Sequence, residues 1–458
     1  MLRRSVILFA GIGLSIPTGI ILAALLSRRL GPEFYGLLTV TNSVIFWLEL
    51  GSTQLFARTA VRFIAADADE TWRGTAATLL RAQGAVSLLA TLLALLLTPL
   101  LARLLNAPLL ALTLPILALD IPLYGLAQVQ GSVLIGRGRA WQRSSLFAVR
   151  WVGRFLWIAL FLTLGFSIYA SLFGYLLASA LEMLLAARYL RVSFRLRPEK
   201  PLRGLFAFAL PIWFYTVGLE LFNTVDLWSV QALLPGPSAG YYAAAQYLTI
   251  LPDLIAASIS PVLIGSIIQQ LANGQNAAVS IRAAFRFILS LTPFVALAAA
   301  SAAPLLALIY EPIYQSAAPA LAVLLIGSIG VMLIVIGTAV LVALHRPLWT
   351  GVLAVLLVPL AVVGHALVVR NGNVFGAALV TAALAWVGGL TVMLAACRQS
   401  SAALPYRSLV RALLLSFAAY AVSALWQVEG WPVLIKLSLL SLPLMGIALA
   451  VGDWPQHT

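Results

Sequence analysis

Three carboxylates lie inside long apolar stretches of this sequence: Glu220, Asp226 and Asp253. At the centre of a membrane-spanning helix, an ionised carboxylate costs about 2.5 to 3.5 kcal/mol on insertion scales, so it normally faces protein or water. Carboxylates in such a setting either line a polar cavity or form structural hydrogen bonds to a neighbouring helix. Their positions predict a polar interior within the membrane.

Polar side chains share helix faces with these acids. At about 100° per residue, one stripe on the predicted helix 205–230 contains Thr216, Glu220, Asn223 and Asp226. The next predicted helix, 241–268, carries Tyr242, Gln246, Thr249, Asp253 and Ser260, and helix 34–57 carries Asn42, Glu49 and Thr53. We therefore expect a substrate cavity to be lined by Asn42, Glu49, Glu220, Asn223, Asp226, Gln246 and Asp253.

A basic stripe opens the predicted helix 145–165. If the helix starts early, the members of this stripe lie within about 60° of one another: Arg139, Arg143, Arg150 and Arg154. Arginine offers planar, bidentate donors that suit phosphate oxygens. The predicted diphosphate site therefore consists of Arg58, Arg62, Arg150 and Arg154. The alternative is anchoring to anionic lipid head groups, and Asp120 and Glu182 are predicted to be structural.

The composition is that of a membrane protein built from helices. The 458 residues are 62% hydrophobic and 9% charged, and the mean hydropathy is +1.03, far from the soluble range. The long unbroken apolar runs indicate helices rather than barrel strands. We predict an all-α polytopic protein with about fourteen membrane-spanning helices: 5–26, 34–57, 76–102, 108–132, 145–165, 168–188, 205–230, 241–268, 283–306, 317–343, 349–369, 374–396, 408–426 and 431–451.

The 28 basic residues and the net charge of +14 raise the question of a nucleic acid partner. Their distribution favours the membrane instead, because they fall in alternate connections between the predicted helices, apart from Arg28, Arg29, Arg103, Arg370 and Lys436. The positive-inside rule then predicts a multi-pass protein of the inner or plasma membrane with both termini cytoplasmic. The N-terminal apolar run continues to Leu26 without an Ala-x-Ala site, so we interpret it as a retained helix.

Signals of catalysis are missing from the sequence. The lone Cys397 excludes an internal disulfide or a cysteine metal site, and the three histidines have no metal-binding spacing. There is no nucleotide loop, Asp-rich motif or Ser/His/Asp set. We predict a protein that is not an enzyme and uses no cofactor or metal. The alternative, a membrane glycosyltransferase or polymerase, needs a large outer loop with acids, and the predicted outer loops are short.

An internal repeat divides the chain. A shift of 205 residues places Arg81 on Arg286 and Pro99-Leu-Leu-Ala102 on Pro304-Leu-Leu-Ala307; after one deletion, Glu49 meets Asp253. An even number of helices per copy predicts two six-helix lobes related by a pseudo-twofold axis along the membrane normal. The predicted parts are an N-terminal lobe, a basic cytoplasmic linker, a C-terminal lobe and an extra helix pair: 1–190, 191–204, 205–397 and 398–458.

Short motifs resemble one transporter family. Three stretches resemble the polysaccharide transporters: the segment Leu26-Ser-Arg-Arg-Leu-Gly-Pro-Glu-Phe-Tyr-Gly36, the helix end Gln54-Leu-Phe-Ala-Arg58-Thr-Ala-Val-Arg62, and the stretch from Leu210-Pro-Ile-Trp213 through Asp226 to Gly240-Tyr-Tyr-Ala243. These belong to the multidrug/oligosaccharidyl-lipid/polysaccharide (MOP) exporter superfamily. The resemblance implies a V-shaped, two-lobed flippase with a cavity lined by helices one, two, seven and eight, working by alternating access.

The implied substrate is a polyprenyl-diphosphate-linked oligosaccharide, taken from the cytoplasmic to the outer leaflet during polysaccharide biosynthesis. The expected partners are this lipid-linked oligosaccharide, membrane lipid and a coupling cation, H⁺ or Na⁺, and no nucleic acid. The alternative within the superfamily is a cation-coupled drug exporter, which normally has twelve helices, two fewer than the number predicted here.

Overall fold

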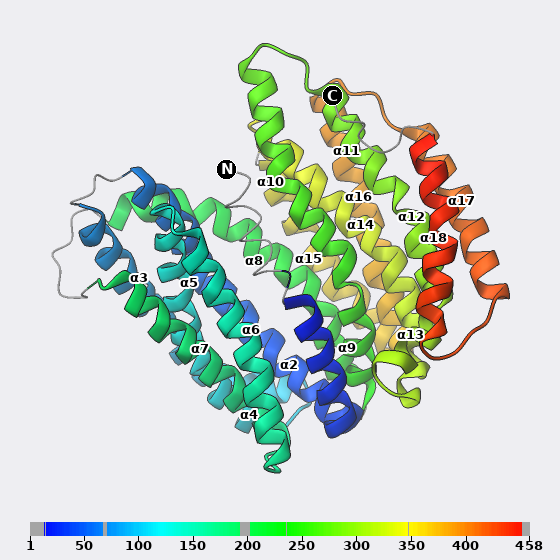
Figure 1. Ribbon diagram of the computed structural model, residues 1–458. Coiled ribbons are helices and arrows are strands. Elements are labelled where there is room, and N and C mark those ends of the chain that lie inside the picture. The colour runs from blue at the N-terminus through cyan, green and yellow to red at the C-terminus, as the bar shows by residue number, and fades with distance from the viewer. Residues whose placement is uncertain are drawn as a thin grey trace. The chain divides into compact units, whose positions relative to one another are not determined.

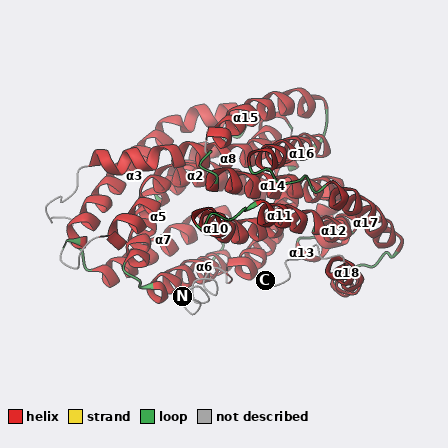
Figure 2. Cartoon of the chain, turned by 90° about the horizontal axis from the view of Figure 1, so that it is seen from above, coloured by secondary structure: helices red, strands yellow, loops and turns green. Residues whose placement is uncertain are grey.

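The described part of the chain is helical throughout. The computed structural model describes residues 13, 15–66, 71–192, 202–234, 236–346 and 348–450. Within these ranges every regular element is an α-helix or a short 3₁₀-helix, and Figure 2 shows only helices joined by loops. Ten of the described helical segments are long and apolar enough to cross a membrane. The predicted all-α membrane fold is confirmed, whereas the number fourteen stays a prediction.

The chain forms two compact units, Met1–Thr224 and Val225–Thr458. The division falls inside one helix, α8 (Leu202–Leu233), so this helix contributes to both units. The basic linker predicted at 191–204 lies mostly outside the described residues. The lobes and the extra pair, with the boundaries expected from the sequence, therefore stay a prediction.

Unit 1 is a bundle in which α2 packs against α5 and α6 packs against α7 (Figure 1). Its elements are α2 (Ser15–Ala66), α3 (Trp72–Leu104), α4 (Leu110–Ala118), α5 (Asp120–Gly136), α6 (Ala140–Thr163), α7 (Ile168–Leu190) and the first part of α8. Gly31 divides α2 into two helices, as predicted, because its φ of 73° is a conformation that glycine adopts without steric cost. Pro32 then starts the second helix with a preset φ.

The core of unit 1 is apolar where α2, α3, α5 and α6 meet. Phe56, Ile64, Leu79, Val133 and Leu146 are all completely buried there. Two indoles tie the first part of α8 to α2: Trp47 Nε1 donates to the carbonyl of Val217 at 3.2 Å, and Trp213 Nε1 donates to the carbonyl of Gly51. These reciprocal bonds explain why α8 belongs to unit 1 as far as Thr224.

Unit 2 is arranged around a long, mostly buried helix, α14 (Ala318–Ala343), which packs against α10, α12 and α16. Its other elements are the end of α8, α9 (Ser238–Leu248), α10 (Ile250–Ala272), α11 (Ala278–Ser290), α12 (Thr292–Ala300), α13 (Ala302–Ile309), η1 (Pro312–Ala317), α15 (Leu348–Val368), η2 (Val369–Asn371), α16 (Val374–Gln399), α17 (Tyr406–Leu425) and α18 (Pro432–Ala450).

Three of the predicted helices are interrupted. The predicted spans 108–132, 241–268 and 283–306 contain breaks at Leu119, Thr249, Leu291 and Ser301. Each break precedes a proline by two or three residues: Pro122, Pro252, Pro293 and Pro304. Proline has no N–H to donate to the preceding turn, and its ring clashes with the carbonyl four residues earlier, so the helix is interrupted or kinked there.

Small residues allow α14 and α16 to approach closely (Figure 1). A Cβ placed on Gly330 would lie 2.5 Å from the carbonyl carbon of Ala385 and 2.6 Å from the nitrogen of Trp386. On the partner helix, a Cβ on Gly389 would lie 2.6 Å from the carbonyl oxygen of Gly330. Because these neighbours are backbone atoms, they cannot move aside without separating the two helices.

We expect Gly330→Ala to lower the stability of unit 2 by about 1 to 3 kcal/mol, the usual effect of overpacking a close contact. Thermal unfolding of the detergent-solubilised protein would measure the change. The matched control is Gly265→Ala on α10, where an added Cβ meets no atom within 4 Å. Equal melting temperatures for the two variants would contradict the expectation.

A buried lysine attaches α18 to its neighbours. Lys436 Nζ donates to the carbonyl of Ser423 at 2.7 Å and to Ser301 Oγ at 3.0 Å, and the lysine side chain is only 2% exposed. These bonds connect α18 with the end of α17 and with the junction between α12 and α13. The C-terminal pair of helices is therefore held to unit 2 by polar contacts.

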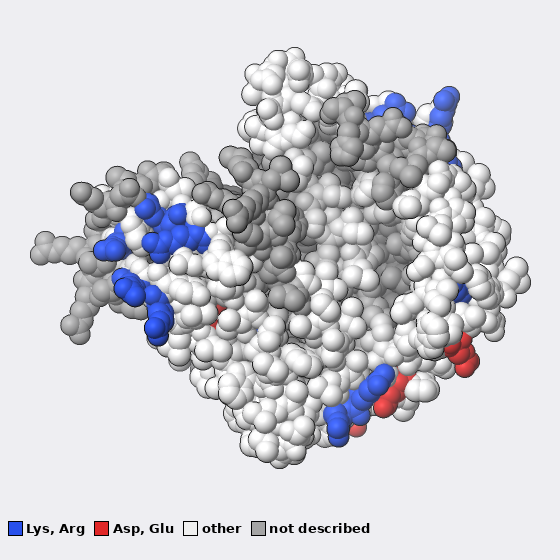
Figure 3. Space-filling model, viewed as in Figure 1, with Lys and Arg blue, Asp and Glu red and all other residues white. Residues whose placement is uncertain are grey.

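The outer surface carries many large apolar side chains, as a lipid-facing surface requires. Leu96 on α3, Phe417 on α17 and Leu425 at the end of α17 are each more than three-quarters exposed. On the face shown in Figure 3, charged side chains occupy only small areas. This surface supports the conclusion that the protein passes through the membrane several times.

Candidate functional site

Unit 1 contains a buried group of charged side chains, which we call the arginine cluster. Arg143, Arg150 and Arg154 lie on one face of α6, as their spacing predicts. Three carboxyl groups from three other helices face them: Glu49 on α2, Asp120 on α5 and Glu182 on α7. None of these six residues is more than 8% exposed. Four helices thus contribute to one charged site inside the bundle.

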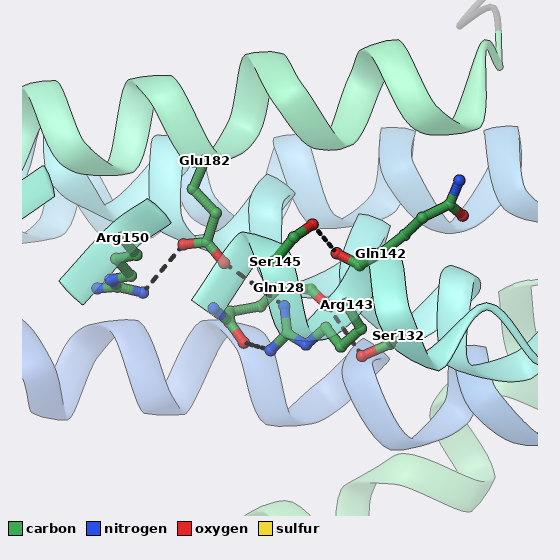
Figure 4. A network of polar contacts seen from close by, with 7 residues as sticks. All are labelled: Gln128, Ser132, Gln142, Arg143, Ser145, Arg150 and Glu182. Carbon is green, nitrogen blue, oxygen red and sulfur yellow. Dashed lines mark hydrogen bonds and ion pairs between the residues drawn. The ribbon is translucent and has the colours of Figure 1, made fainter. Parts of the chain in front are cut away.

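Glu182 lies between two of the arginines (Figure 4). Its Oε1 is 3.5 Å from Arg143 Nη1, and its Oε2 is 3.6 Å from Arg150 Nη1. Arg143 also donates through Nη2 to Gln128 Oε1 at 2.6 Å. The shared carboxylate joins α7 to two positions on α6 that are two helical turns apart, and Gln128 adds α5 to the same network.

Aromatic rings cover the guanidinium groups. The Arg150 guanidinium carbon lies 3.8 Å from the centre of the Tyr124 ring, and that of Arg154 lies 4.1 Å from the centre of the Tyr175 ring. Arg143 is stacked over Phe147 in the same way, at 4.3 Å. Cation–π contacts of this kind are most stabilising where water is excluded, so the rings contribute to keeping the cations buried.

The carboxyl groups at the other end of the arginine cluster are close to each other. Asp120 Oδ2 is 3.9 Å from Arg154 Nη2, a distance too long for a hydrogen bond. The carboxyl group of Glu49, which is 4% exposed, neighbours that of Asp120 and faces Arg150 and Arg154. Asp120 Oδ1 is buried and receives no hydrogen bond from any described residue. Asp120 is therefore held by one long guanidinium contact, whereas two guanidinium groups contact Glu182.

Unit 2 contains a second buried polar group around Asp226, which we call the aspartate cluster. Asp226 Oδ2 accepts hydrogen bonds from the Tyr242 hydroxyl at 2.7 Å and from Thr381 Oγ1 at 3.2 Å. Gln246 Nε2 lies 3.2 Å from Oδ1, which also accepts from the backbone N–H of Leu227 at 2.7 Å. The Asp226 side chain is only 1% exposed. Four donors therefore surround one carboxylate.

A histidine extends the aspartate cluster. His365 Nε2 lies 3.1 Å from Thr381 Oγ1, and its Nδ1 lies 2.6 Å from the carbonyl of Ala361. Helix periodicity places Asp226 on one polar stripe and Tyr242 and Gln246 on another, but it does not indicate Thr381 or His365. An isolated polar residue inside each of two apolar helices, α15 and α16, was the available signal. Helix periodicity does not show which helices are neighbours, so these two residues could not be assigned to Asp226 from the sequence.

The remaining candidates are distributed over several elements. Asn42 on α2, Glu220 and Asn223 on α8, and Asp253 in the first turn of α10 are half-buried. Glu220 and Asn223 belong to unit 1 and Asp253 to unit 2. Arg58 and Arg62 lie on α2, but their side chains are outside the described residues. The structure thus brings together Asp226 with Gln246, and Glu49 with Arg150 and Arg154; the roles expected for all of these residues stay predictions.

A metal centre finds no support in the described part of the chain. No group of three or more His, Cys, Asp or Glu side chains is arranged there to hold a metal ion. The buried charges are paired with each other or with neutral donors instead. The two clusters can neutralise charge, exchange protons or hold a small cation in a dry environment.

Comparisons with known proteins match this chain to one protein family and to solved structures of transporters. The family model described as polysaccharide biosynthesis protein matches residues 1–267. Among solved structures, one described as the lipid II flippase MurJ in an inward closed conformation shares the fold with a TM-score of 0.79 and 15% identity, over 98% of each chain. A search of the curated proteins finds no match.

Two further structures share the fold less completely. An inward-facing multidrug resistance MATE family transporter of the MOP superfamily has a TM-score of 0.70 and 16% identity, covering 85% of this chain and 94% of its own. A MOP superfamily transporter from Pyrococcus furiosus has a TM-score of 0.60 and 17% identity, covering 87% and 95%. At these identities the likeness concerns the fold alone.

Proposed function

The chain belongs to the polysaccharide biosynthesis protein family, and we propose that it moves a polyprenyl-diphosphate-linked oligosaccharide from the cytoplasmic to the outer leaflet by alternating access. Membership of this family confirms the resemblance that the short motifs indicated. The family and the shared fold identify a multi-pass membrane transporter of the MOP type. The lipid-linked substrate, the inner or plasma membrane location and the cytoplasmic termini are parts of the proposal.

One observation carries the choice of a flippase. The fold shared with the protein described as a lipid II flippase extends over 98% of this chain, whereas the fold shared with the MATE transporter covers 85%. The longer match therefore extends over nearly the whole chain, including most of the C-terminal pair α17 and α18. A lipid-linked substrate also suits a protein with so apolar an outer surface, because its lipid tail can stay in the bilayer while the polar head passes.

The second candidate function is that of a cation-coupled small-molecule exporter of the same superfamily. The fold shared with multidrug resistance transporters favours it, and the aspartate cluster is compatible with it. A membrane glycosyltransferase or polymerase has less support, because the family and the neighbouring folds are those of transporters. No catalytic residues or cofactors are part of the proposal.

The aspartate cluster is the proposed site of the coupling cation, H⁺ or Na⁺. A carboxylate that is 1% exposed and receives four hydrogen bonds offers a fixed negative charge in a dry site. Asn42, Glu220, Asn223 and Asp253, which are all half-buried, are proposed to contact the hydroxyl groups of the oligosaccharide.

The proposed diphosphate site consists of Arg58, Arg62, Arg150 and Arg154. The last two face carboxyl groups inside unit 1, so a diphosphate would have to replace those partners to reach them. Arg58 and Arg62 lie one helical turn apart on the same helix, and replacing this pair tests phosphate binding while leaving the ion pairs of Arg150 and Arg154 in place.

The test is complementation. The gene is expressed in a cell that lacks its own oligosaccharide flippase, and surface glycan is measured. We expect surface glycan to be restored, and the Arg58→Ala/Arg62→Ala variant to lose this restoration at normal protein level. Failure with every lipid-linked donor, together with lowered intracellular levels of cationic dyes, would replace the flippase by the drug exporter.

A further inference from the structure

The charges of the arginine cluster balance only on one condition. Three guanidinium groups, which are always protonated in proteins, share a buried volume with the carboxyl groups of Glu49, Asp120 and Glu182. The cluster is neutral if all three carboxyl groups are ionised. It carries a charge of +1 if one of them is protonated. Its net charge is therefore decided by the carboxyl groups.

Two of these carboxyl groups oppose full ionisation by their positions. The side chains of Glu49 and Asp120 are neighbours, and neither residue is more than 4% exposed. Two carboxylates that share a buried site repel each other, and a proton on Glu49 removes this repulsion. Glu182 is different, because Arg143 and Arg150 face its two oxygens.

An unsatisfied oxygen supports a proton at this position. Asp120 Oδ1 is buried and receives no hydrogen bond from any described donor, and the Arg154 contact to Oδ2 is 3.9 Å long. Buried carboxyl oxygens without a donor are costly. A protonated Glu49 is a neighbouring group that supplies the missing donor, because its O–H can point to Asp120.

We propose that Glu49 and Asp120 together bind one exchangeable proton, carried as an O–H on Glu49 that donates to Asp120. The proton comes from water and returns to it, and no other group changes its bonding. The groups facing the pair are Tyr124 from α5 and Arg150 and Arg154 from α6, and Arg150 also contacts Glu182 from α7. Binding changes the cluster from neutral to +1.

This proton site would act through α2. Loss of the proton gives Glu49 a full charge opposite Arg150 and Arg154 and strengthens the attraction between α2 and α6; gain of the proton weakens it. The same helix carries Asn42 and Arg58, both assigned above to substrate contacts. The role of this proton site in transport rests on the proposed function. Proton binding itself does not, because it is a property of unit 1.

Infrared difference spectroscopy of the purified full-length protein in lipid nanodiscs tests the proposal, because a protonated carboxyl group has its own C=O stretching band. We expect a band that persists at a pH where carboxyl groups in water are ionised. Labelling all glutamates with ¹³C at the side-chain carboxyl should shift this band without any substitution. Glu49→Gln and Asp120→Asn should each remove it, the second because Glu49 then ionises opposite the arginines.

The matched control is Glu220→Gln, which removes another carboxyl group of the same unit at a half-buried position. The band should remain in this variant and in Asp226→Asn. A wild-type spectrum with no band that shifts on glutamate labelling would overturn the proposal, and so would an unchanged band in folded Glu49→Gln. The experiment needs no substrate, so it tests proton binding even if the proposed transport function is wrong.

Discussion

Glu182→Ala should lower the free energy of unfolding of unit 1 by about 3 to 5 kcal/mol, the usual effect of removing one partner from a buried ion pair. The loss is large because Glu182 faces both Arg143 and Arg150, at 3.5 and 3.6 Å, and these guanidinium groups are buried. The substitution leaves two cations without their shared carboxylate in a place that water cannot reach. Thermal unfolding of the solubilised protein, read by circular dichroism, measures the effect.

Two further variants sharpen this prediction. Glu182→Gln keeps the size of the side chain and one hydrogen-bond acceptor, so its loss should be smaller than that of Glu182→Ala. Glu33→Ala removes an exposed carboxyl group from α2 and should leave stability nearly unchanged. If Glu182→Ala unfolds at the same temperature as Glu33→Ala, the ion pairs of the arginine cluster do not stabilise unit 1.

Asp226→Asn should lower export about tenfold or more, equivalent to about 1.4 kcal/mol on the transport barrier, while the protein level stays normal. Asparagine keeps the shape of the side chain and an oxygen that can accept from Leu227 N and Gln246 Nε2. The hydroxyl groups of Tyr242 and Thr381 can rotate to accept from the new amide. The fold is thus preserved and the negative charge is lost. Surface glycan in the complementation strain is the measurement.

The control for the aspartate cluster keeps the charge and removes a donor. Tyr242→Phe deletes one of the hydrogen bonds to Asp226, so it should reduce export far less than Asp226→Asn. Combining Asp226→Asn with Asp253→Asn extends the test to the second acid of the predicted stripes. Unchanged export in this double variant would assign both carboxyl groups a structural role only.

The sequence by itself determined the class of this protein and the contents of its helix faces. Apolar runs of bilayer length predict membrane helices because the backbone must satisfy its hydrogen bonds internally in lipid. The spacing of Arg143, Arg150 and Arg154 placed these residues on one face of α6, and helix periodicity linked Asp226 with Asn223 and Tyr242 with Gln246. These are local properties, since they depend only on the rise and twist of one helix.

Only the tertiary structure decided which faces meet. The sequence predicted a diphosphate site around Arg150 and Arg154, whereas in the structure these side chains face Glu182, Asp120 and Glu49 from three other helices. The partners Thr381 and His365 of the aspartate cluster come from helices more than a hundred residues away from Asp226. Apolar helices of similar length can pack in many orders, because lipid tails and leucine side chains are equally apolar. The order is selected by close contacts such as that of Gly330 with α16 and by buried polar groups finding partners, and both depend on the assembled bundle.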